Sequence, residues 1–325
     1  MPVSGFIRFL FQQPPSVISV FIFVAKPKHI ELPNGITIPI IYEDSAIMAI
    51  DKPEGWLLAP DDWDRTGRNL QLAIESSMNA PDFWARSRNL RFLRYVHRLD
   101  ADTTGLLLMA KSPGAVRAFG ELFENQQIKK AYLAVVRGVP KQQEWTCRLP
   151  LGEHPYRPGL MVVDQLAGKE AETHFRVIQA GAKSALILVE PRTGRTHQIR
   201  VHLAESEHPV LNDPLYAGEG TPERRDQREP LALRAFRLSY VDPFRQRPIH
   251  IQAPVTQFLQ HFGFPDADAL LRPVRAVVKE TEKPGAGDKA AVKPGQDLKP
   301  TKPTPTKPEG KGWPQRTQGD AKGKG

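Results

Sequence analysis

The densest group of residues that can carry out chemistry lies between Tyr95 and Gly105 and centres on Asp100. Asp100 stands in a polar loop that leads into the apolar segment Leu106–Leu108. We therefore expect a carboxylate that is partly shielded from water, with basic neighbours that keep it ionised. Such a carboxylate can act as a nucleophile or as a general base. Taken alone, however, Asp102–Gly105 is ordinary turn chemistry, and a turn aspartate is then the simpler interpretation.

Two metal-dependent motifs also begin at this loop, and neither is completed further along the chain. The spacing of Asp100, Asp102 and Thr104 matches the start of a haloacid-dehalogenase-type phosphatase site, but no Gly-Asp-x-x-x-Asp metal segment follows. The same residues resemble a calcium loop, but Lys111 occupies the twelfth position, where a bidentate glutamate belongs. We therefore expect no metal site here, and a metal-dependent phosphatase is an unfavoured alternative.

A second group of candidate residues occupies 190–203, where an apolar strand is expected to turn into a helix. It contains three arginines, namely Arg192, Arg195 and Arg200. Arginines and free backbone N–H groups at the start of a helix form an anion site. We expect Thr196 to cap this helix and Ile199 with Leu203 to form its buried stripe. His197 and His202 are five residues apart, which is wrong for two zinc ligands on one helix face, so we expect structural histidines.

A third segment places Lys130 and Tyr132 on a predicted strand, Ala131–Val136, which ends near Gly138. The ring of Tyr132 can either face a nucleic-acid base or belong to the core. This segment alone does not decide between the two.

The elements that must position these residues include more strands than helices. Further strands are predicted at Ile38–Tyr42, Ile47–Ile50, Leu106–Ala110, Thr173–Val177 and Ala185–Val189. A helix is predicted to begin after the N-cap Ser112, with Pro113 in its first turn, and to end near Asn125. Several strands follow one another across short turns, which favours an α+β fold with an antiparallel sheet over a βαβ array.

Composition limits the classes of protein that fit. The chain has 325 residues, of which 40% are hydrophobic, enough to bury a core, and its single cysteine excludes an intrachain disulfide. A formal net charge of +9 favours a polyanionic partner, RNA or DNA first. The longest apolar run near the start, Val17–Ala25, is shorter than the ~20 residues of a membrane-spanning helix. We therefore expect a soluble cytoplasmic protein with no membrane partner.

Three regions follow from these changes in composition. Residues 1–35 are expected to be an N-terminal extension, and residues 36–275 one globular domain. Residues 276–325 are rich in Lys, Pro and Gly and have almost no large apolar side chains. Such a segment cannot offset its chain entropy by burial, so we expect a disordered basic tail.

Taken together and in this order, the segments resemble the RluA-type family of RNA pseudouridine synthases. The resemblance extends from about Ile38 to Pro254, and its matching segments are Asp51–Gly55, His97–Leu107, Lys130–Tyr132, Thr193–His202 and Leu231–Leu238. It implies a central mixed, mostly antiparallel sheet that is flanked by helices and crossed by a cleft. It also implies an isomerase that converts uridine to pseudouridine in RNA, with no cofactor and no metal.

The resemblance further implies roles for single residues. Asp100 matches the family's essential aspartate, Arg200 the basic residue that pairs with it, and Tyr132 the tyrosine that packs on the target base. Arg98 matches the arginine that fills the gap left by the flipped nucleotide. Other RNA contacts are expected from His97, Lys130, Arg192 and Arg195. The detached uracil must be kept from water, and Leu106–Leu108 is the expected apolar wall.

Three positions depart from the residues that are usual in the family: Asn212 replaces glycine, Arg234 histidine and Thr104 serine. We expect a monomer that modifies ribosomal or transfer RNA. The main alternative is a non-catalytic RNA-binding or ribosome-assembly protein on the same fold. That alternative explains the positive charge but gives no reason for the combination of Asp100, Tyr132 and Arg200.

Overall fold

The computed structural model describes residues 25–58, 68–80, 82–217 and 229–271. All of them belong to the first of the two units into which the chain divides, Met1–Pro273. The predicted basic tail at 276–325 and most of the predicted extension at 1–35 lie outside the described residues. None of the helices in the described part has the length and apolar composition needed to span a bilayer.

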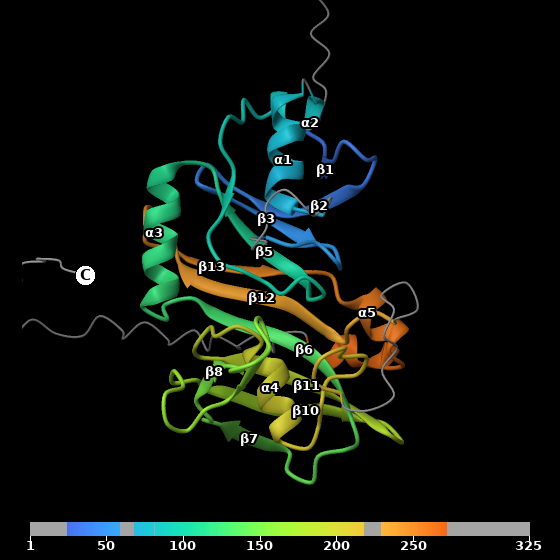
Figure 1. Cartoon of the computed structure of the whole chain (residues 1–325). Helices are drawn as coiled ribbons and strands as arrows, with labels where there is room; N and C mark the ends of the chain where they lie inside the picture. Colours follow the sequence, from blue (N-terminus) through green and yellow to red (C-terminus); the bar gives the residue numbers. More distant parts are fainter. Residues whose placement is uncertain (1–24, 59–67, 81, 218–228, 272–325) are drawn as a thin grey trace, which may run out of the picture. The chain divides into compact units, whose positions relative to one another are not determined.

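An eleven-stranded sheet forms the framework (Figure 1). Its strands are β1 (His29–Glu31), β2 (Thr37–Glu43), β3 (Ile47–Lys52), β4 (Arg94–Tyr95), β5 (Thr104–Ala110), β6 (Lys129–Arg137), β7 (Glu144–Cys147), β10 (Thr173–Ala180), β11 (Ser184–Pro191), β12 (Leu233–Val241) and β13 (Pro248–Gln252). Along the main path their order is β1-β2-β3-β5-β12-β6-β11-β10-β7, with β4 beside β5 and β13 beside β12. Among the described strands, β5 and β12 pair in parallel and the other pairs are antiparallel. The predicted mixed, mostly antiparallel sheet is confirmed.

Helices and one small sheet complete this framework. The helical segments are α1 (Leu70–Asn79), α2 (Phe83–Arg86), α3 (Pro113–Glu124), α4 (Gln198–Glu205), α5 (Thr256–His261), η2 (Pro265–Ala267) and α6 (Asp268–Leu271). A separate two-stranded sheet consists of β8 (Leu151–Glu153) and β9 (Met161–Val163). In Figure 1, α4 and this small sheet lie near β10 and β11, whereas α3 lies along the other half of the large sheet.

Local sequence signals account for several of these elements. The hydroxyl of Ser112 accepts a hydrogen bond from the backbone of Ala115, and Pro113 begins α3, as predicted. The alternating residues of β10 turn at Gly181 and return as β11, which confirms that predicted hairpin. The sheet begins earlier than predicted, because β1 pairs with β2 and Ile30 is fully buried. The described part of the sheet thus includes residues before 36.

The parallel pairing of β5 with β12 depends on a glycine. Gly105, at the start of β5, has a φ of 106°, in a region that L side chains rarely adopt. A Cβ at this position would collide with the backbone carbonyl of Ala235 on β12. Since β5 begins directly after the Asp100 loop, this close approach of two backbones places the loop against the middle of the sheet.

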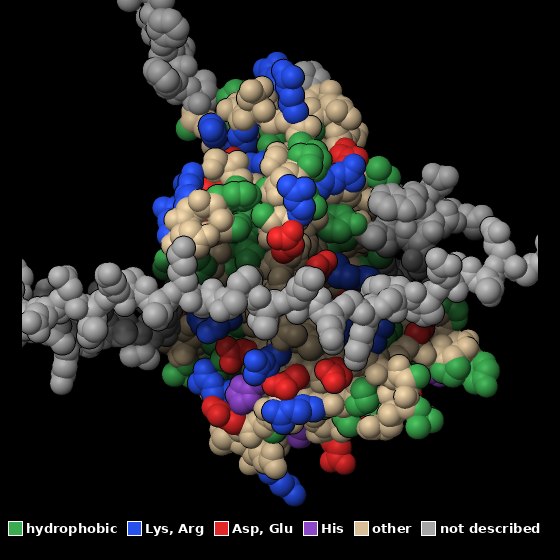
Figure 2. Space-filling view, turned by 90° about the vertical axis from the view of Figure 1, so that its left-hand side faces the viewer, with side chains coloured by type: hydrophobic (Ala, Val, Ile, Leu, Met, Phe, Trp, Pro, Cys, Tyr) green, Lys and Arg blue, Asp and Glu red, His purple; other side chains and the backbone are tan. Residues whose placement is uncertain are grey.

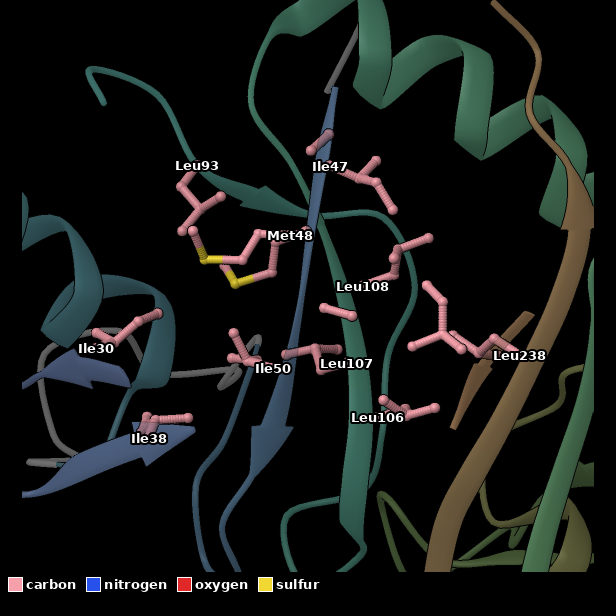
Figure 3. Close-up of a cluster of buried hydrophobic side chains, with 14 of the residues drawn as sticks. Ile30, Ile38, Ile47, Met48, Ile50, Leu93, Leu106, Leu107, Leu108 and Leu238 are labelled. Carbon is pink, nitrogen blue, oxygen red and sulfur yellow. The ribbon is translucent and has the colours of Figure 1, made fainter. Parts of the chain in front are cut away.

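Leu106, Leu107 and Leu108 follow on β5 and are fully buried. Figure 3 shows them among the side chains of β3, with Ile47, Met48 and Ile50 nearby. They therefore anchor β5 in the core.

Candidate active site

A cavity of about 400 Å³ opens where three segments meet. Val96–Asp100 comes from the loop before β5, Lys130 and Tyr132 come from β6, and Pro191–Arg200 connects β11 to α4. Every residue that the sequence singled out for catalysis or RNA contact lines it, namely His97, Arg98, Asp100, Lys130, Tyr132, Arg192, Arg195 and Arg200. Among the described residues there is no cluster of His, Cys, Asp and Glu side chains that could hold a metal ion.

Asp100 and Arg200 meet inside this cavity. Nη1 of Arg200 donates a hydrogen bond of 3.3 Å to Oδ2 of Asp100. The side chain of Arg200 is 3% exposed and that of Asp100 is 17% exposed, so the guanidinium is buried while the carboxylate still reaches the cavity. This is the contact expected from the resemblance. The catalytic role of the two residues is taken up below as a proposal.

A second carboxylate holds the same guanidinium. Nε and Nη2 of Arg200 each donate a hydrogen bond of 2.7 Å to Asp213, whose side chain is fully buried. The backbone N–H groups of Leu215 and Tyr216 donate to Oδ1 of Asp213 and fix the carboxylate. Although burial opposes its charge, these hydrogen bonds and the charges of Asp213 and Asp100 raise the pKa of Arg200. Arg200 therefore carries its positive charge permanently and in one orientation.

Asn212, one of the three departures from the family, stands in the turn directly before Asp213. Asn212 has a φ of 61°, the left-handed region that favours glycine and that asparagine tolerates better than most residues. Its side-chain amide donates to the carbonyl of Pro230. Asparagine thus adopts a backbone conformation that is otherwise typical of glycine.

The loop of Asp100 is tied down by a buried lysine. Nζ of Lys52, which is fully buried on β3, donates hydrogen bonds of 2.7 Å to the carbonyl of Ala101 and 3.0 Å to that of Thr103. The N–H of Gly55 also donates to the carbonyl of Ala101. These bonds fix the backbone directly after Asp100. They also explain why Asp51–Gly55, far away in sequence, accompanies the aspartate motif.

Tyr132 lines the cavity from β6, and the charge of Asp100 affects the pKa of its phenol. Burial, and to a smaller degree that charge, raise the pKa of the Tyr132 phenol above its usual value. The phenol is therefore protonated at neutral pH. Its ring and its O–H group, rather than a phenolate, are what it offers to a ligand.

His97 is held by two contacts inside the protein. Its Nε2 accepts a hydrogen bond of 3.0 Å from the backbone of Leu108, and its ring stacks on Phe123 at 4.6 Å. Burial, with the charge of Lys130, lowers the pKa of His97 to about 3, so the ring is neutral. These contacts give His97 a structural function in the wall of the cavity. Its predicted contact with RNA stays a prediction.

The basic residues around the cavity differ in their freedom to bind a ligand. Nζ of Lys130 donates to the carbonyl of Thr193, and burial lowers its pKa to about 8. Arg98, Arg192 and Arg195 are exposed, and Nε of Arg195 donates to the carbonyl of Glu170. Figure 2 shows Lys and Arg side chains spread over one face of the molecule, with Asp and Glu between them. The charge on this face is thus mixed. At the cavity itself, the exposed arginines supply positive charge.

Two expectations about this site are wrong. Leu106–Leu108 do not line the cavity, because β5 is an inner strand and these side chains pack in the core. The apolar part of the wall comes instead from other residues, among them Val96, Leu99, Phe123, Ile199 and Leu233. The N-cap of α4 is His197 rather than Thr196, and the His197 side chain does not cap the helix. The Gln198 side chain instead accepts a hydrogen bond from the N–H of Arg195, in the loop before the helix. The predicted buried pair Ile199 and Leu203 is confirmed.

Sequence reasoning missed three residues that organise the site, namely Lys52, Asp213 and Tyr216. Asp213 and Tyr216 follow Asn212, which the sequence singles out only as a departure from the usual glycine. The ring of Tyr216 lies 5.1 Å from the guanidinium carbon of Arg200. A signal was available in the sequence for Lys52, which lies inside the matching segment Asp51–Gly55, whereas Asp213 is next to the departure at Asn212. The structural roles of His202 were foreseen: its ring nitrogens bond the Thr173 hydroxyl and the carbonyl of Leu149.

Comparisons with known proteins agree with this geometry. Residues 46–205 match the family model described as RNA pseudouridylate synthase. The chain is 32% identical over 224 residues to an uncharacterized RNA pseudouridine synthase of Mycoplasma genitalium, covering 69% of this chain and 68% of the relative. It is 31% identical over 237 residues to the ribosomal large subunit pseudouridine synthase C of Salmonella typhimurium, covering 71% of each.

The fold also resembles a solved structure. The human protein RNA Pseudouridylate Synthase Domain Containing 1 superposes with a TM-score of 0.54 at 24% sequence identity, over 71% of this chain and 86% of that one. The fold, the matched motifs and the relatives point the same way. The chain therefore belongs to the RNA pseudouridylate synthase family, the enzymes that isomerise uridine to pseudouridine in RNA.

Proposed function

We propose that this protein converts one or more uridines of ribosomal RNA to pseudouridine, and that Asp100 is the group without which the reaction stops. The observation that carries the proposal is the hydrogen bond from the buried Arg200 to Asp100 at the edge of a cavity. A carboxylate that is aimed by a permanent cation, and only 17% exposed, is a strong candidate for attack on an electrophilic carbon.

The reaction breaks the bond between N1 and C1′, turns the base and forms a bond between C5 and C1′. The target nucleotide must first leave its stack, which costs a few kcal/mol. Arg98 and Tyr132 both line the cavity, Arg98 with an exposed side chain and Tyr132 partly buried. We assign Arg98 to the gap left in the RNA and Tyr132 to the face of the extruded base, since both residue types stack on bases.

Asp100 then has three candidate roles. Its carboxylate attacks C1′ of the ribose, attacks the base, or takes a proton from C2′. All three need an ionised carboxylate within reach of the nucleotide, and the contact with Arg200 serves each of them by orienting Oδ2. The surrounding apolar side chains, such as Val96 and Phe123, support the proposal because the detached uracil must be kept from water until the new bond forms.

Ribosomal RNA is the proposed substrate because the Salmonella relative carries ribosomal large subunit in its name. Transfer RNA is the alternative within the same reaction class. A cytoplasmic location follows from a ribosomal substrate. A non-catalytic RNA-binding protein is disfavoured, because a binding surface gains nothing from a carboxylate held by a buried arginine at 3.3 Å.

The test is a map of pseudouridine in all cellular RNA. Cells that lack the gene are compared with cells that carry it and with cells complemented by the Asp100→Asn variant. We expect one or more sites of ribosomal RNA to lose pseudouridine in the deletion strain and to stay unmodified with Asp100→Asn. Loss of sites in transfer RNA would correct the substrate, and an unchanged map would contradict the proposed function.

A further inference from the structure

His197 has an unusual backbone and a central place in the site. It stands at the start of α4 with a φ of 52°, in the left-handed region that a histidine seldom adopts. It lines the main cavity and also a second cavity of about 300 Å³, and both cavities include Asp100 and Arg200. A backbone conformation of this kind persists only where the surrounding structure imposes it, and it often marks a functional position.

The hydrogen bonds of Tyr216 determine which nitrogen of His197 carries the proton. The backbone N–H of Met161, on β9, donates a bond of 3.0 Å to the Tyr216 hydroxyl oxygen. The same hydroxyl lies 2.8 Å from Nδ1 of His197. A phenol O–H is a stronger hydrogen-bond donor than the N–H of a neutral imidazole, and Nδ1 is the acceptor within reach of the Tyr216 proton, so we assign the bond as Tyr216 donating to Nδ1. An accepting Nδ1 places the ring proton on Nε2.

The imidazole is neutral, so Nε2 keeps a single proton to donate. Burial lowers the pKa of His197. The charges that face the ring oppose one another, since Asp100 and Asp213 raise its pKa while Arg200 and Arg98 lower it. The contacts described for this ring, with Tyr216 through Nδ1 and through an edge-on ring packing at 5.7 Å, leave Nε2 without a hydrogen-bond partner among the described residues. His197 is only partly buried, so water in the cavity can accept from this N–H, and a ligand that displaces the water can supply an acceptor in its place.

We propose that Nε2–H of His197 donates a hydrogen bond to a carbonyl oxygen of the extruded uracil, O2 or O4. This inference rests on the proposed function. When the bond between N1 and C1′ breaks, its electron pair stays with the uracil and is shared with O2 and O4. A fixed neutral donor at one of these oxygens stabilises that charge and transfers no proton. The Met161 N–H, the Tyr216 hydroxyl and the His197 ring form a chain of hydrogen bonds that leads to this donor, and each bond of such a chain polarises the next.

The experiment replaces the acceptor atom and the donor in turn. Single-turnover rates are measured with RNA that carries uridine, 2-thiouridine or 4-thiouridine at the target position, because sulfur is a weaker acceptor than oxygen. The main variant is His197→Asn, since asparagine tolerates the left-handed backbone but is too short to reach the base. We expect it to be slower by about 10- to 100-fold, the range for one hydrogen bond to a charged group.

The informative result is the combination of the two changes. One of the two sulfur substitutions should slow the reaction of the unchanged enzyme. The same substitution should cause no further slowing of the His197→Asn variant. His250→Asn, on β13 and outside both cavities, should behave like the unchanged enzyme. His197→Gln should recover part of the rate, because its amide N–H can reach further. If His197→Asn does not fold, Tyr216→Phe should weaken the same sulfur effect, since it removes the proton that sets the tautomer.

Two failures can be told apart. If both sulfur substitutions slow His197→Asn as much as they slow the unchanged enzyme, the donor is not at a carbonyl and this inference is wrong. If the unchanged enzyme forms no pseudouridine in any RNA, the proposed function is wrong instead.

Discussion

Asp213 binds two nitrogens of Arg200 at 2.7 Å each and leaves the third, Nη1, pointing at Asp100. Asp213 is fully buried and Arg200 is 3% exposed. The planar fork of the guanidinium makes this division possible, because one edge binds Asp213 while the remaining nitrogen is aimed at the cavity. The geometry of the Asp100 carboxylate is thus set by a residue that does not itself reach the cavity.

Arg200→Lys keeps the positive charge and removes the fork. We expect pseudouridine formation to slow by about 100-fold or more, because an ammonium group cannot bind Asp213 twice and still reach Asp100. Lysine still places a positive charge beside Asp213 but loses one of the two hydrogen bonds to it, so we expect a loss of about 1.5 to 3 kcal/mol in unfolding free energy. Single-turnover assays and urea unfolding measure the two effects.

Asp213→Asn is the matched variant, since it keeps the shape of the side chain and removes its charge. It should lower the rate in the same direction and by a similar order. A rate within twofold of the unchanged enzyme for either variant would remove this arrangement from the mechanism.

Gly105→Ala tests the approach of β5 to β12. A methyl group there collides with the carbonyl of Ala235, and the φ of 106° is strained for alanine, so we expect a loss of about 2 to 4 kcal/mol in unfolding free energy. Gly120→Ala is the control. Gly120 lies in α3 with open space around its Cβ position, and alanine should stabilise the protein there by about 0.5 to 1 kcal/mol. Equal melting temperatures for the two variants would contradict the account of this contact.

Lys130 should give the reaction a pH limit on the alkaline side. Burial lowers the pKa of Lys130 to about 8, so the free enzyme loses this positive charge as the pH rises through that value. If the ammonium group attracts the RNA, kcat/KM falls above about pH 8 and does not depend on this group well below it. Lys130→Arg stays charged over the whole range and should abolish the fall. Parallel pH profiles for the two proteins would show that Lys130 does not contribute its charge.

Local signals in the sequence were sufficient for part of the fold. Ser112 and Pro113 start α3 because a hydroxyl cap and a proline act on neighbouring backbone groups. The alternating residues of β10 and the apolar run of β11 likewise reflect the burial of each strand, and the two strands pair across a short turn. The parallel pairing of β5 with β12 joins residues that are far apart in sequence, so no local sequence pattern predicts it.

The site was predictable to the extent that it lies in compact motifs. Asp100, Tyr132 and Arg200 stand in such motifs, and the structure brings all three to one cavity. Lys52 was missed because lysine is normally a surface residue, and only the fold shows that it binds the carbonyls beside Asp100. The three leucines of β5 were misplaced because an apolar run looks the same whether it faces a cavity or a core.

The central claim is that the carboxylate of Asp100 carries out the isomerisation. It is tested most directly by the Asp100→Asn variant in a tritium-release assay with RNA labelled at C5 of uridine, alongside a measurement of RNA binding. Asparagine keeps the size of the side chain and removes the charge that Arg200 holds at 3.3 Å. We predict that release falls to background while the dissociation constant for RNA changes by less than about fivefold. Substantial tritium release by this variant would contradict the account.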